Sequence, residues 1–460
     1  MGGTENTVRA QARALVARGH EVVVVAGSMQ WEDGFRVSQA TDTDPESGVS
    51  YPIHRIHRDD HYFDHWHKSA SPRVSAAFRN ILLEERPDVI HVQHWIRLSR
   101  DLVAVAARLK IPAVITLHDL WTTCLLTFRL RPNQVGLCEK PLAISPCIAC
   151  AAEVPPKTPW VTFEAGAIAL SERLSDVRRE LDLARAIVTP SRAHATAIEG
   201  FLGLNAGALE SHVIPPGRNI EASAGLDSRA NRTIESQSAS GRLVLGAWGH
   251  LDPIKGLDVV LEAIRKLKDP SKVTLHVAGQ EVNPDFAAKV HALAEGLDVH
   301  FHGTFEVQEL ASHPVTAVHA MVSGSRAHES WGLVLDEAWQ LGLPAILPNR
   351  GAFVERLEAH KAGVLYESSS SDDLAAVIER LLADARILDE LRAGIPDHDQ
   401  ISPNLEQMVN QLESVYNVAL EAGPPTPPGD ESLVDLVRAR ALQEWDKSLQ
   451  RRTPTELGFE

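Results

Sequence analysis

The sequence predicts an α/β protein made of two domains with mainly parallel sheets, and three observations support this. At 460 residues the chain is too long for one hydrophobic core and suits two domains of ordinary size. Helical and strand patterns alternate along most of it. The stretch 221–241, EASAGLDSRANRTIESQSASG, is polar and has no period, so a domain boundary is expected there.

The first domain is predicted over residues 1–225. A helical pattern in GTENTVRAQARALVARGH ends at Gly19, a residue type that commonly ends helices. Buried strands are expected in EVVVVAG, DVIHVQ, AVITLHD and AIVTPS, with helices between them. The histidine-rich run 54–68 lacks a clean metal-ligand spacing, so a solvated loop is expected there in preference to a metal site.

The start of the first domain departs from this pattern, because Met1 stands directly before the glycines of GGTE. In a doubly wound sheet the first strand is central. Its loss would leave unpaired backbone on both neighbouring strands. A true start upstream of Met1 is therefore expected, with an apolar strand leading into GGTE.

The second domain is predicted over 242–399, after a linker at 226–241. Its strands are expected in RLVLGAWG, VTLHVAG, DVHFHG, AVHAMVSG and PAILPN. A further helix is predicted over 400–422. A proline-rich linker and charged tail then form an appendage at 423–460.

Composition restricts the classes of partner. The formal net charge is −16 and no strongly basic block is present, which argues against a general hold on nucleic acid or anionic membrane. Membrane contact is expected to be peripheral at most. No apolar run approaches the ~18 residues that a membrane span requires, and no signal peptide is seen, so we expect a cytoplasmic protein. A small ligand is the favoured partner.

The stretch ESWGLVLDE places two glutamates around a helix start in the second domain. Glu329 falls in the turn before the helix that carries Glu337, and eight helical residues span about 12 Å. Backbone N–H groups at the helix start favour an anion, and a glycine there allows close approach. The N–H groups concerned are those of Ser330, Trp331, Gly332 and Leu333. Such a glutamate pair taken alone is more often solvated.

A lysine in the same domain supports the interpretation that this segment binds an anion. Lys255 and Gly256 stand in the turn after the domain's first strand, where an ammonium group suits phosphate oxygens. A surface lysine is the alternative for Lys255 alone.

These segments, with GGTE, VITLHD and AGVLY, resemble a family 4 glycosyltransferase of the GT-B fold over residues 1 to about 420. The resemblance implies two Rossmann-like doubly wound domains facing across a crevice. It also implies transfer of a sugar from a nucleotide-sugar donor, with retention, to a sugar or lipid-linked acceptor. No cofactor is required for this catalysis. Cell-surface polysaccharide or glycoconjugate synthesis is one setting for such an enzyme.

The resemblance also implies roles for individual residues. Glu329 would face the donor sugar, Glu337 the ribose and Lys255 the diphosphate. His118 would lie in the crevice near the transferred sugar, and Gly2 and Gly3 would form a substrate-binding turn. The residues assigned to catalysis are His118 and Glu329. The helix of 400–422 would cross back onto the first domain.

One departure from the family pattern concerns His250, which stands where the family usually has an arginine. A phosphate contact there would be weakened or would depend on pH. Together with the missing strand, this keeps two alternatives open. One is an inactive GT-B binding or regulatory protein, and the other is a sugar-nucleotide epimerase or a phosphorylase.

All four cysteines lie within residues 124–150 and include a C-x-x-C pair. In a cytoplasmic chain this clustering favours a structural zinc site over disulfides. Ordinary buried thiols are the alternative. The proposed ligands are Cys124, Cys138, Cys147 and Cys150.

Overall fold

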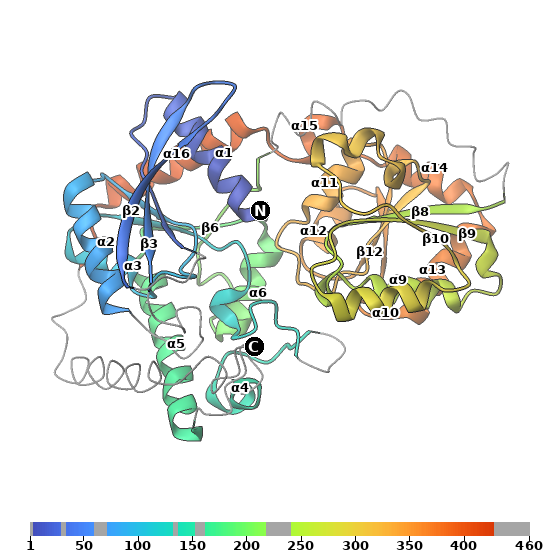
Figure 1. Cartoon of the computed structure of the whole chain (residues 1–460), viewed down its shortest axis with the longest axis horizontal. Helices are drawn as coiled ribbons and strands as arrows, with labels where there is room; N and C mark the ends of the chain where they lie inside the picture. The colour runs from blue at the N-terminus through green and yellow to red at the C-terminus, as the bar shows by residue number, and fades with distance from the viewer. Residues whose placement is uncertain are drawn as a thin grey trace.

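A computed structural model describes residues 3–28, 34–58, 71–131, 137–151, 162–217 and 241–426. The chain forms two α/β lobes that lie side by side, with α6 (Arg192–Leu202) and α12 (Ala352–Ala359) between them (Figure 1). Each lobe contains parallel strands covered by helices, so the predicted fold class is confirmed. No helix among these residues is long and apolar enough to cross a membrane.

The first lobe contains two sheets. In the smaller one, β1 (Val24–Gly27) pairs in parallel with β3 (Ser50–His57), which pairs in antiparallel with β2 (Arg36–Thr43). The larger sheet is parallel and has the order β4-β5-β6-β7. Its strands are β4 (Ile90–Val92), β5 (Ala113–Thr116), β6 (Ala186–Thr189) and β7 (His212–Val213).

Val25 and Leu98 pack against the hydrophobic clusters of both sheets, so the two sheets share one core. No described strand pairs with the second edge of β1 or of β4. In the doubly wound strand order this position belongs to the central first strand.

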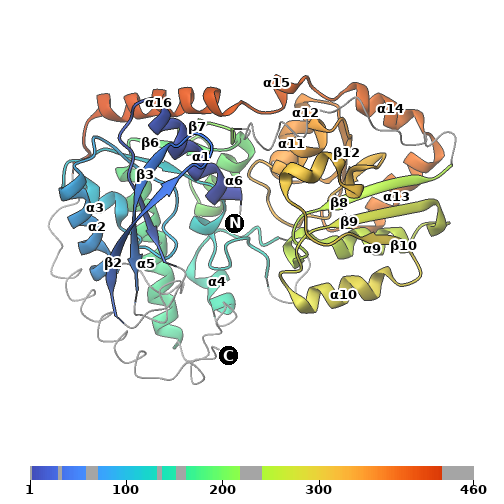
Figure 2. The ribbon, with the colours of Figure 1, turned by 45° about the horizontal axis from the view of Figure 1, so that its top comes forward.

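The helices of the first lobe cover both faces of its sheets (Figure 2). Several have recognisable caps: the Ser191 side chain accepts a hydrogen bond at the start of α6, and Gly203 ends that helix in a left-handed conformation. The other helices of the first lobe are α1 (Gly3–Ala17), α2 (Pro72–Glu85), α3 (Leu102–Arg108), the 3₁₀ turn η1 (Trp121–Thr123), α4 (Ile144–Ala151) and α5 (Phe163–Leu183).

The second lobe contains one six-stranded parallel sheet with the order β10-β9-β8-β11-β12-β13. Its order reverses beside β8, the first strand of the lobe, which is the doubly wound arrangement. The strands are β8 (Leu243–Trp248), β9 (Val273–Ala278), β10 (Asp298–Phe301), β11 (Ala320–Val322), β12 (Ala345–Pro348) and β13 (Gly363–Tyr366).

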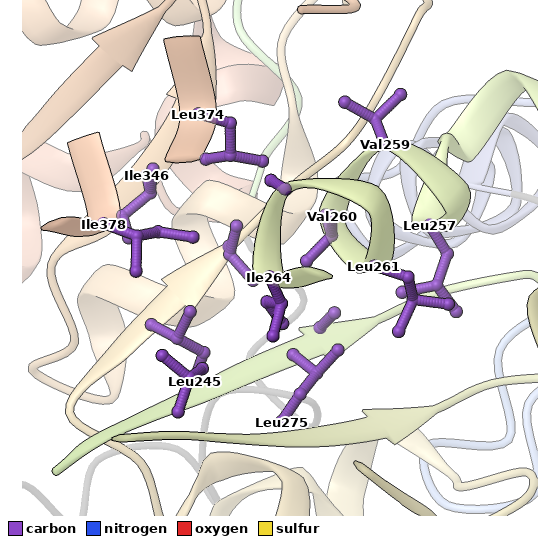
Figure 3. Close-up of a cluster of buried hydrophobic side chains, with 14 of the residues drawn as sticks. Leu245, Leu257, Val259, Val260, Leu261, Ile264, Leu275, Ile346, Leu374 and Ile378 are labelled. Carbon is purple, nitrogen blue, oxygen red and sulfur yellow. The ribbon is translucent and has the colours of Figure 1, made fainter. Parts of the chain in front are cut away.

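Helix α9 (Leu257–Arg265) buries its apolar face on this sheet. Figure 3 shows Val260 and Ile264 of α9 pointing toward Leu245 of β8 and Leu275 of β9. The other helices are α10 (Pro284–Ala294), α11 (Leu333–Gln340), α13 (Ser371–Ala383), α14 (Arg386–Ala393) and α15 (His398–Ile401). The 3₁₀ turns are η2 (Pro253–Lys255), η3 (Pro270–Lys272), η4 (Val307–Ser312) and η5 (Pro314–Thr316).

The last helix, α16 (Leu405–Ala422), leaves the second lobe and packs on the first (Figure 2). A capping box of Asn404 and Gln407 begins it. Its apolar face, which includes Met408 and Leu412, joins a core cluster with residues of β5 and β6. Helix α16 therefore gives the second lobe a further connection to the first.

The structure corrects one sequence expectation and leaves others untested. Residues 36–57 form the β2–β3 hairpin, which the sequence interpretation missed, so His54 and His57 are buried strand residues and not part of a solvated loop. Residues 59–68 of the histidine-rich run, the linker at 226–240 and the tail beyond residue 426 lie outside the described residues.

Candidate active site

The turn between β8 and α9 carries Lys255. The turn is tight because Asp252 caps the short η2 helix and Gly256 adopts a left-handed conformation at φ 62°. A Cβ on Gly256 would lie 2.0 Å from the carbonyl oxygen of Gly324, which follows β11. Only glycine allows this approach, and it brings the β8–α9 and β11–α11 loops together at the carboxyl ends of their strands.

Glu329 lies in the second of these loops and pairs with Lys255. The Lys255 Nζ atom donates to Glu329 Oε1 at 3.1 Å, and the hydroxyl of Ser325 donates to the same oxygen at 2.8 Å. Burial acts to raise the pKa of Glu329, but Lys255 and Ser325 outweigh it, so the pKa is lowered. Glu329 raises the pKa of Lys255 in turn. Both groups are therefore charged at neutral pH.

Glu337 lies on the second turn of α11, on the same side of the lobe. The indole Nε1 of Trp248, at the end of β8, donates to Glu337 Oε2 at 2.7 Å. Burial raises the pKa of Glu337 to about 7, against the lowering effect of Trp248. Its carboxyl can therefore either accept or donate a hydrogen bond near neutral pH.

The start of α11 depends on Gly332, which precedes Leu333 with φ 85°. A Cβ on Gly332 would lie 2.4 Å from the Phe353 ring, so packing between α11 and α12 already requires glycine here. Arg356 of α12 supports the same turn by stacking on the Trp331 ring at 4.3 Å and pairing with Asp336. The first N–H groups of α11 lack partners within the helix by geometry.

On the first lobe, His118 follows β5 and donates from Nε2 to Gln93 Oε1 at 2.7 Å. Because the amide oxygen only accepts, this contact leaves Nδ1 of the neutral ring without its proton. Burial lowers the pKa of His118 to about 4. Gln93 also contacts Nδ1 of His91 at 3.1 Å, and the same nitrogen lies 2.8 Å from the Tyr416 hydroxyl on α16. His118 is therefore held as a neutral ring by a network that includes the crossing helix.

The two lobes are in contact beside the loop between β11 and α11 that carries Glu329. The Ser191 hydroxyl at the start of α6 donates to the backbone oxygen of Ser330 at 2.8 Å. The backbone N–H of Ala193 donates to Glu355 Oε2 of α12 at 2.7 Å. The Glu355 carboxylate of the second lobe thus lies at the N-terminal turn of α6 in the first lobe. The positive end of the helix dipole favours a negative charge at that position.

The remaining predicted residues have less defined surroundings. His250 is exposed at the end of β8. Gly3 begins α1, and Gly2 lies outside the described residues. Sequence reasoning missed Ser325, Trp248 and Gln93 as partners of the site. Only the position of each near a strand's carboxyl end could have indicated them.

The four cysteines share one neighbourhood. Burial raises the pKa of Cys150, and Cys138 and Cys147 lie close enough to raise it further. Burial and the nearby Cys147 likewise raise the pKa of Cys124. Burial acts to raise the pKa of Cys138, but hydrogen bonds from Lys140 and Arg131 outweigh it and the pKa is lowered. In the described part of the chain, no three histidine, cysteine or acidic side chains are arranged to hold a metal ion.

A groove of about 740 Å³ lies elsewhere, between the β2–β3 hairpin and α2. Phe35, Val37 and Ile81 supply its apolar part, and Arg73 and Glu84 its charges. None of the residues discussed above for the site lines it, so we assign the chemistry to the region between the lobes.

Two doubly wound lobes, joined by a crossing helix and meeting at the loop that carries Glu329, define a protein of the GT-B class. The family model described as Glycosyltransferase Family 4 matches residues 1–222, and the model described as Glycosyl transferases group 1 matches residues 229–395. The chain belongs to the family 4 glycosyltransferases. This favours a glycosyltransferase over the inactive binding protein, the epimerase and the phosphorylase.

Individual relatives agree with the family. A D-inositol 3-phosphate glycosyltransferase 1 of Catenulispora acidiphila is 26% identical over 373 residues, covering 77% of this chain and 78% of that protein. A D-inositol 3-phosphate glycosyltransferase of Geodermatophilus obscurus is 30% identical over 220 residues, which span 45% of this chain and 47% of that protein.

Solved structures share the fold. Sucrose-phosphate synthase from Thermosynechococcus elongatus has a TM-score of 0.61 at 18% identity, covering 92% of this chain and 94% of that one. Alr3699/HepE from Anabaena, in complex with UDP and glucose, has a TM-score of 0.55 at 17% identity, covering 90% and 96%.

Proposed function

We propose that this glycosyltransferase moves a sugar, with retention, from a nucleotide-sugar donor held by the second lobe. The carrying observation is the Lys255–Glu329 pair at 3.1 Å, which joins the loops after β8 and β11 next to the start of α11. In this proposal Lys255 and the N–H groups of Ser330 to Leu333 bind the diphosphate. Glu329 accepts from hydroxyls of the sugar and Glu337 from those of the ribose. His250 would lie beside the phosphates.

The chemistry follows from these charges. Cleaving the bond between sugar and phosphate builds negative charge on the leaving diphosphate, and a fixed ammonium with aligned N–H groups stabilises that charge. Neutral His118 would accept a hydrogen bond at Nδ1 from a hydroxyl of the transferred sugar, beside a turn formed by Gly2 and Gly3. A closed contact such as that between Ser191 and Ser330 would exclude water and favour transfer over hydrolysis.

The acceptor is proposed to be a sugar, a polyol or a lipid-linked molecule that enters from the first lobe. Two relatives carry D-inositol 3-phosphate in their names, which supports a polyol phosphate as one candidate. We further propose a cytoplasmic location, with membrane contact at most peripheral, and no cofactor in the catalytic step.

Calorimetric titration with UDP, ADP and GDP tests the donor site. Lys255→Ala should weaken binding of the preferred nucleotide roughly tenfold, because it removes a charged phosphate contact. Lys266→Ala is a matched control, because Lys266 is also ion-paired, at 2.8 Å to Asp372, and is 42% exposed against 45% for Lys255. Equal affinities in wild type and Lys255→Ala would contradict the assignment.

Glu329→Gln separates chemistry from binding. The variant keeps the shape but loses the carboxylate that faces the sugar, so transfer should fall far more than nucleotide affinity. A glutamate with only a structural role would lower both to a similar extent.

A structural zinc bound by Cys124, Cys138, Cys147 and Cys150 is a separate proposal. Four thiols in one neighbourhood are a suitable donor set, although the sulfurs would have to draw closer together. Elemental analysis of dialysed protein should find about one zinc per chain, and chelation should lower the melting temperature. Protein free of zinc with an unchanged melting temperature would leave the cysteines as ordinary thiols.

A further inference from the structure

Three side chains with buried nitrogen atoms that form no hydrogen bond gather beside Glu329. His194, on the first turn of α6, is fully buried, and neither of its ring nitrogens forms a hydrogen bond of good geometry, although the backbone of Asp119 lies near enough to act on the ring. His328 Nδ1 and Arg350 Nη1 are also buried atoms without partners. Burying such groups unpaired costs free energy, so three together call for an explanation.

The fold brings these residues together from three strand ends. His194 follows β6, His328 follows β11, and Arg350 follows β12. The His194 and His328 rings lie 6.4 Å apart between centroids, across the contact between the lobes. The carboxyl ends of parallel strands are where such sheets bind ligands.

Arg350 is tied to the same place by its neighbour in the chain. A Cβ on Gly351 would lie 3.1 Å from His328 Nδ1 and 2.6 Å from the backbone oxygen of Glu329. The N–H of Ala352 donates to that oxygen at 2.9 Å. The loops after β11 and β12 are therefore held together, and burial together with the nearby Arg350 charge lowers the pKa of His328.

The group is rich in donors and poor in acceptors. The Arg350 guanidinium can only donate, and each neutral imidazole can donate from one nitrogen. The carboxylates of Glu139 and Glu367 lie near enough to oppose the lowering of the Arg350 pKa by burial, but neither forms an ion pair with it within the described ranges. An anion placed between the three side chains could accept a hydrogen bond from each of them, and the lobes would enclose it.

We propose that His194, His328 and Arg350 form a subsite for an anionic group, a phosphate or a carboxylate, carried by one of the two carbohydrate substrates. The inference rests on the proposed function, because it places the anion beside the sugar that Glu329 faces. It is separate from the donor diphosphate, which is assigned to Lys255 and the start of α11. The anion can belong to the acceptor or to the donor sugar.

Calorimetric titrations with the full-length protein test the subsite. Inorganic phosphate is titrated first into the ligand-free protein. With UDP present, myo-inositol 3-phosphate is then compared with myo-inositol, which tests the acceptor. UDP-glucuronic acid is compared with UDP-glucose, which tests the donor sugar. The variants are Arg350→Gln, Arg350→Lys and His328→Asn, and Arg380→Gln on the exposed face of α13 is the control.

Wild type should bind phosphate, and the anionic member of at least one pair should bind about tenfold more tightly than its neutral counterpart. Arg350→Gln should abolish that preference and Arg350→Lys should retain part of it, while the affinity for UDP stays within twofold. His328→Asn should reduce the preference, and Arg380→Gln should leave it unchanged. The pair that shows the preference identifies the substrate that carries the anion.

Three results would overturn the proposal: no phosphate binding and no anionic preference in wild type, a preference that survives Arg350→Gln, or an equal loss of UDP affinity in that variant. The last result would place Arg350 in the diphosphate site. Failure of the protein to bind any nucleotide, with phosphate binding still lost in Arg350→Gln, would reject the proposed donor site and keep the anion subsite.

Discussion

Glu337 should make the second lobe less stable as the pH rises. Burial raises its pKa from 4.5 to about 7, so the folded protein holds a proton that the unfolded chain has released. Stability from this group is therefore fully present below about pH 4.5 and is lost as the pH rises through about 7. At about 1.4 kcal/mol per pKa unit, the loss at pH 8 is at most about 3.5 kcal/mol. Partial exposure of the side chain reduces this, and we expect about 1–2 kcal/mol.

Urea unfolding at pH 5 and pH 8 measures this effect. Glu337→Gln has no proton to lose, so its stability relative to wild type should be about 1–2 kcal/mol more favourable at pH 8 than at pH 5. The control is Glu358→Gln, on the exposed side of α12, which should show no such difference. Parallel pH dependences of the unfolding free energy in wild type and Glu337→Gln would refute the reasoning. They would mean that Glu337 has the same pKa in the folded and the unfolded protein.

Three further outcomes are expected. Gly332→Ala should lower stability by roughly 2 kcal/mol or more in urea unfolding, because the new methyl group would lie 2.4 Å from Phe353 at φ 85°; an unchanged midpoint would contradict the packing described. Asp258→Asn should cost about 3–5 kcal/mol by calorimetry, because it leaves buried Arg326 unpaired; a loss below 1 kcal/mol would count against it. Tyr416→Phe should cost about 1 kcal/mol, since it removes a 2.8 Å hydrogen bond to the first lobe, and an equal or higher melting temperature would show that the bond contributes nothing.

Strand positions were predictable wherever a strand is buried on both faces. Continuous apolar runs such as AVIT and LVLGAW appear as β5 and β8 because a parallel sheet covered by helices needs such runs. The β2–β3 hairpin escaped prediction for the opposite reason. Its strand RVSQATDT is largely exposed and polar, so it lacks the apolar alternation by which a half-buried strand is recognised.

The site was predictable in part from local chemistry. A lysine after the first strand of a lobe and a glutamate before a helix can each be read from the chain, because the positions follow from strand ends and helix starts. The contact between Lys255 and Glu329 could not be predicted, since it depends on Gly256 and Gly324 touching across two loops. The donation from Trp248 to Glu337 is likewise a contact between distant segments.

The structure also indicates why the two halves of the site should act together. His118 on the first lobe is held through Gln93 and His91 by Tyr416, which lies on the helix that follows the entire second lobe. A rotation of the second lobe that moved α16 would therefore disturb the hydrogen bonds that fix the His118 ring. The Ser191–Ser330 contact acts in the other direction, since it joins the first lobe directly to the loop of Glu329. We therefore expect closure of the lobes to be coupled to the orientation of both proposed catalytic side chains, through Tyr416 for His118 and through the Ser191–Ser330 contact for Glu329.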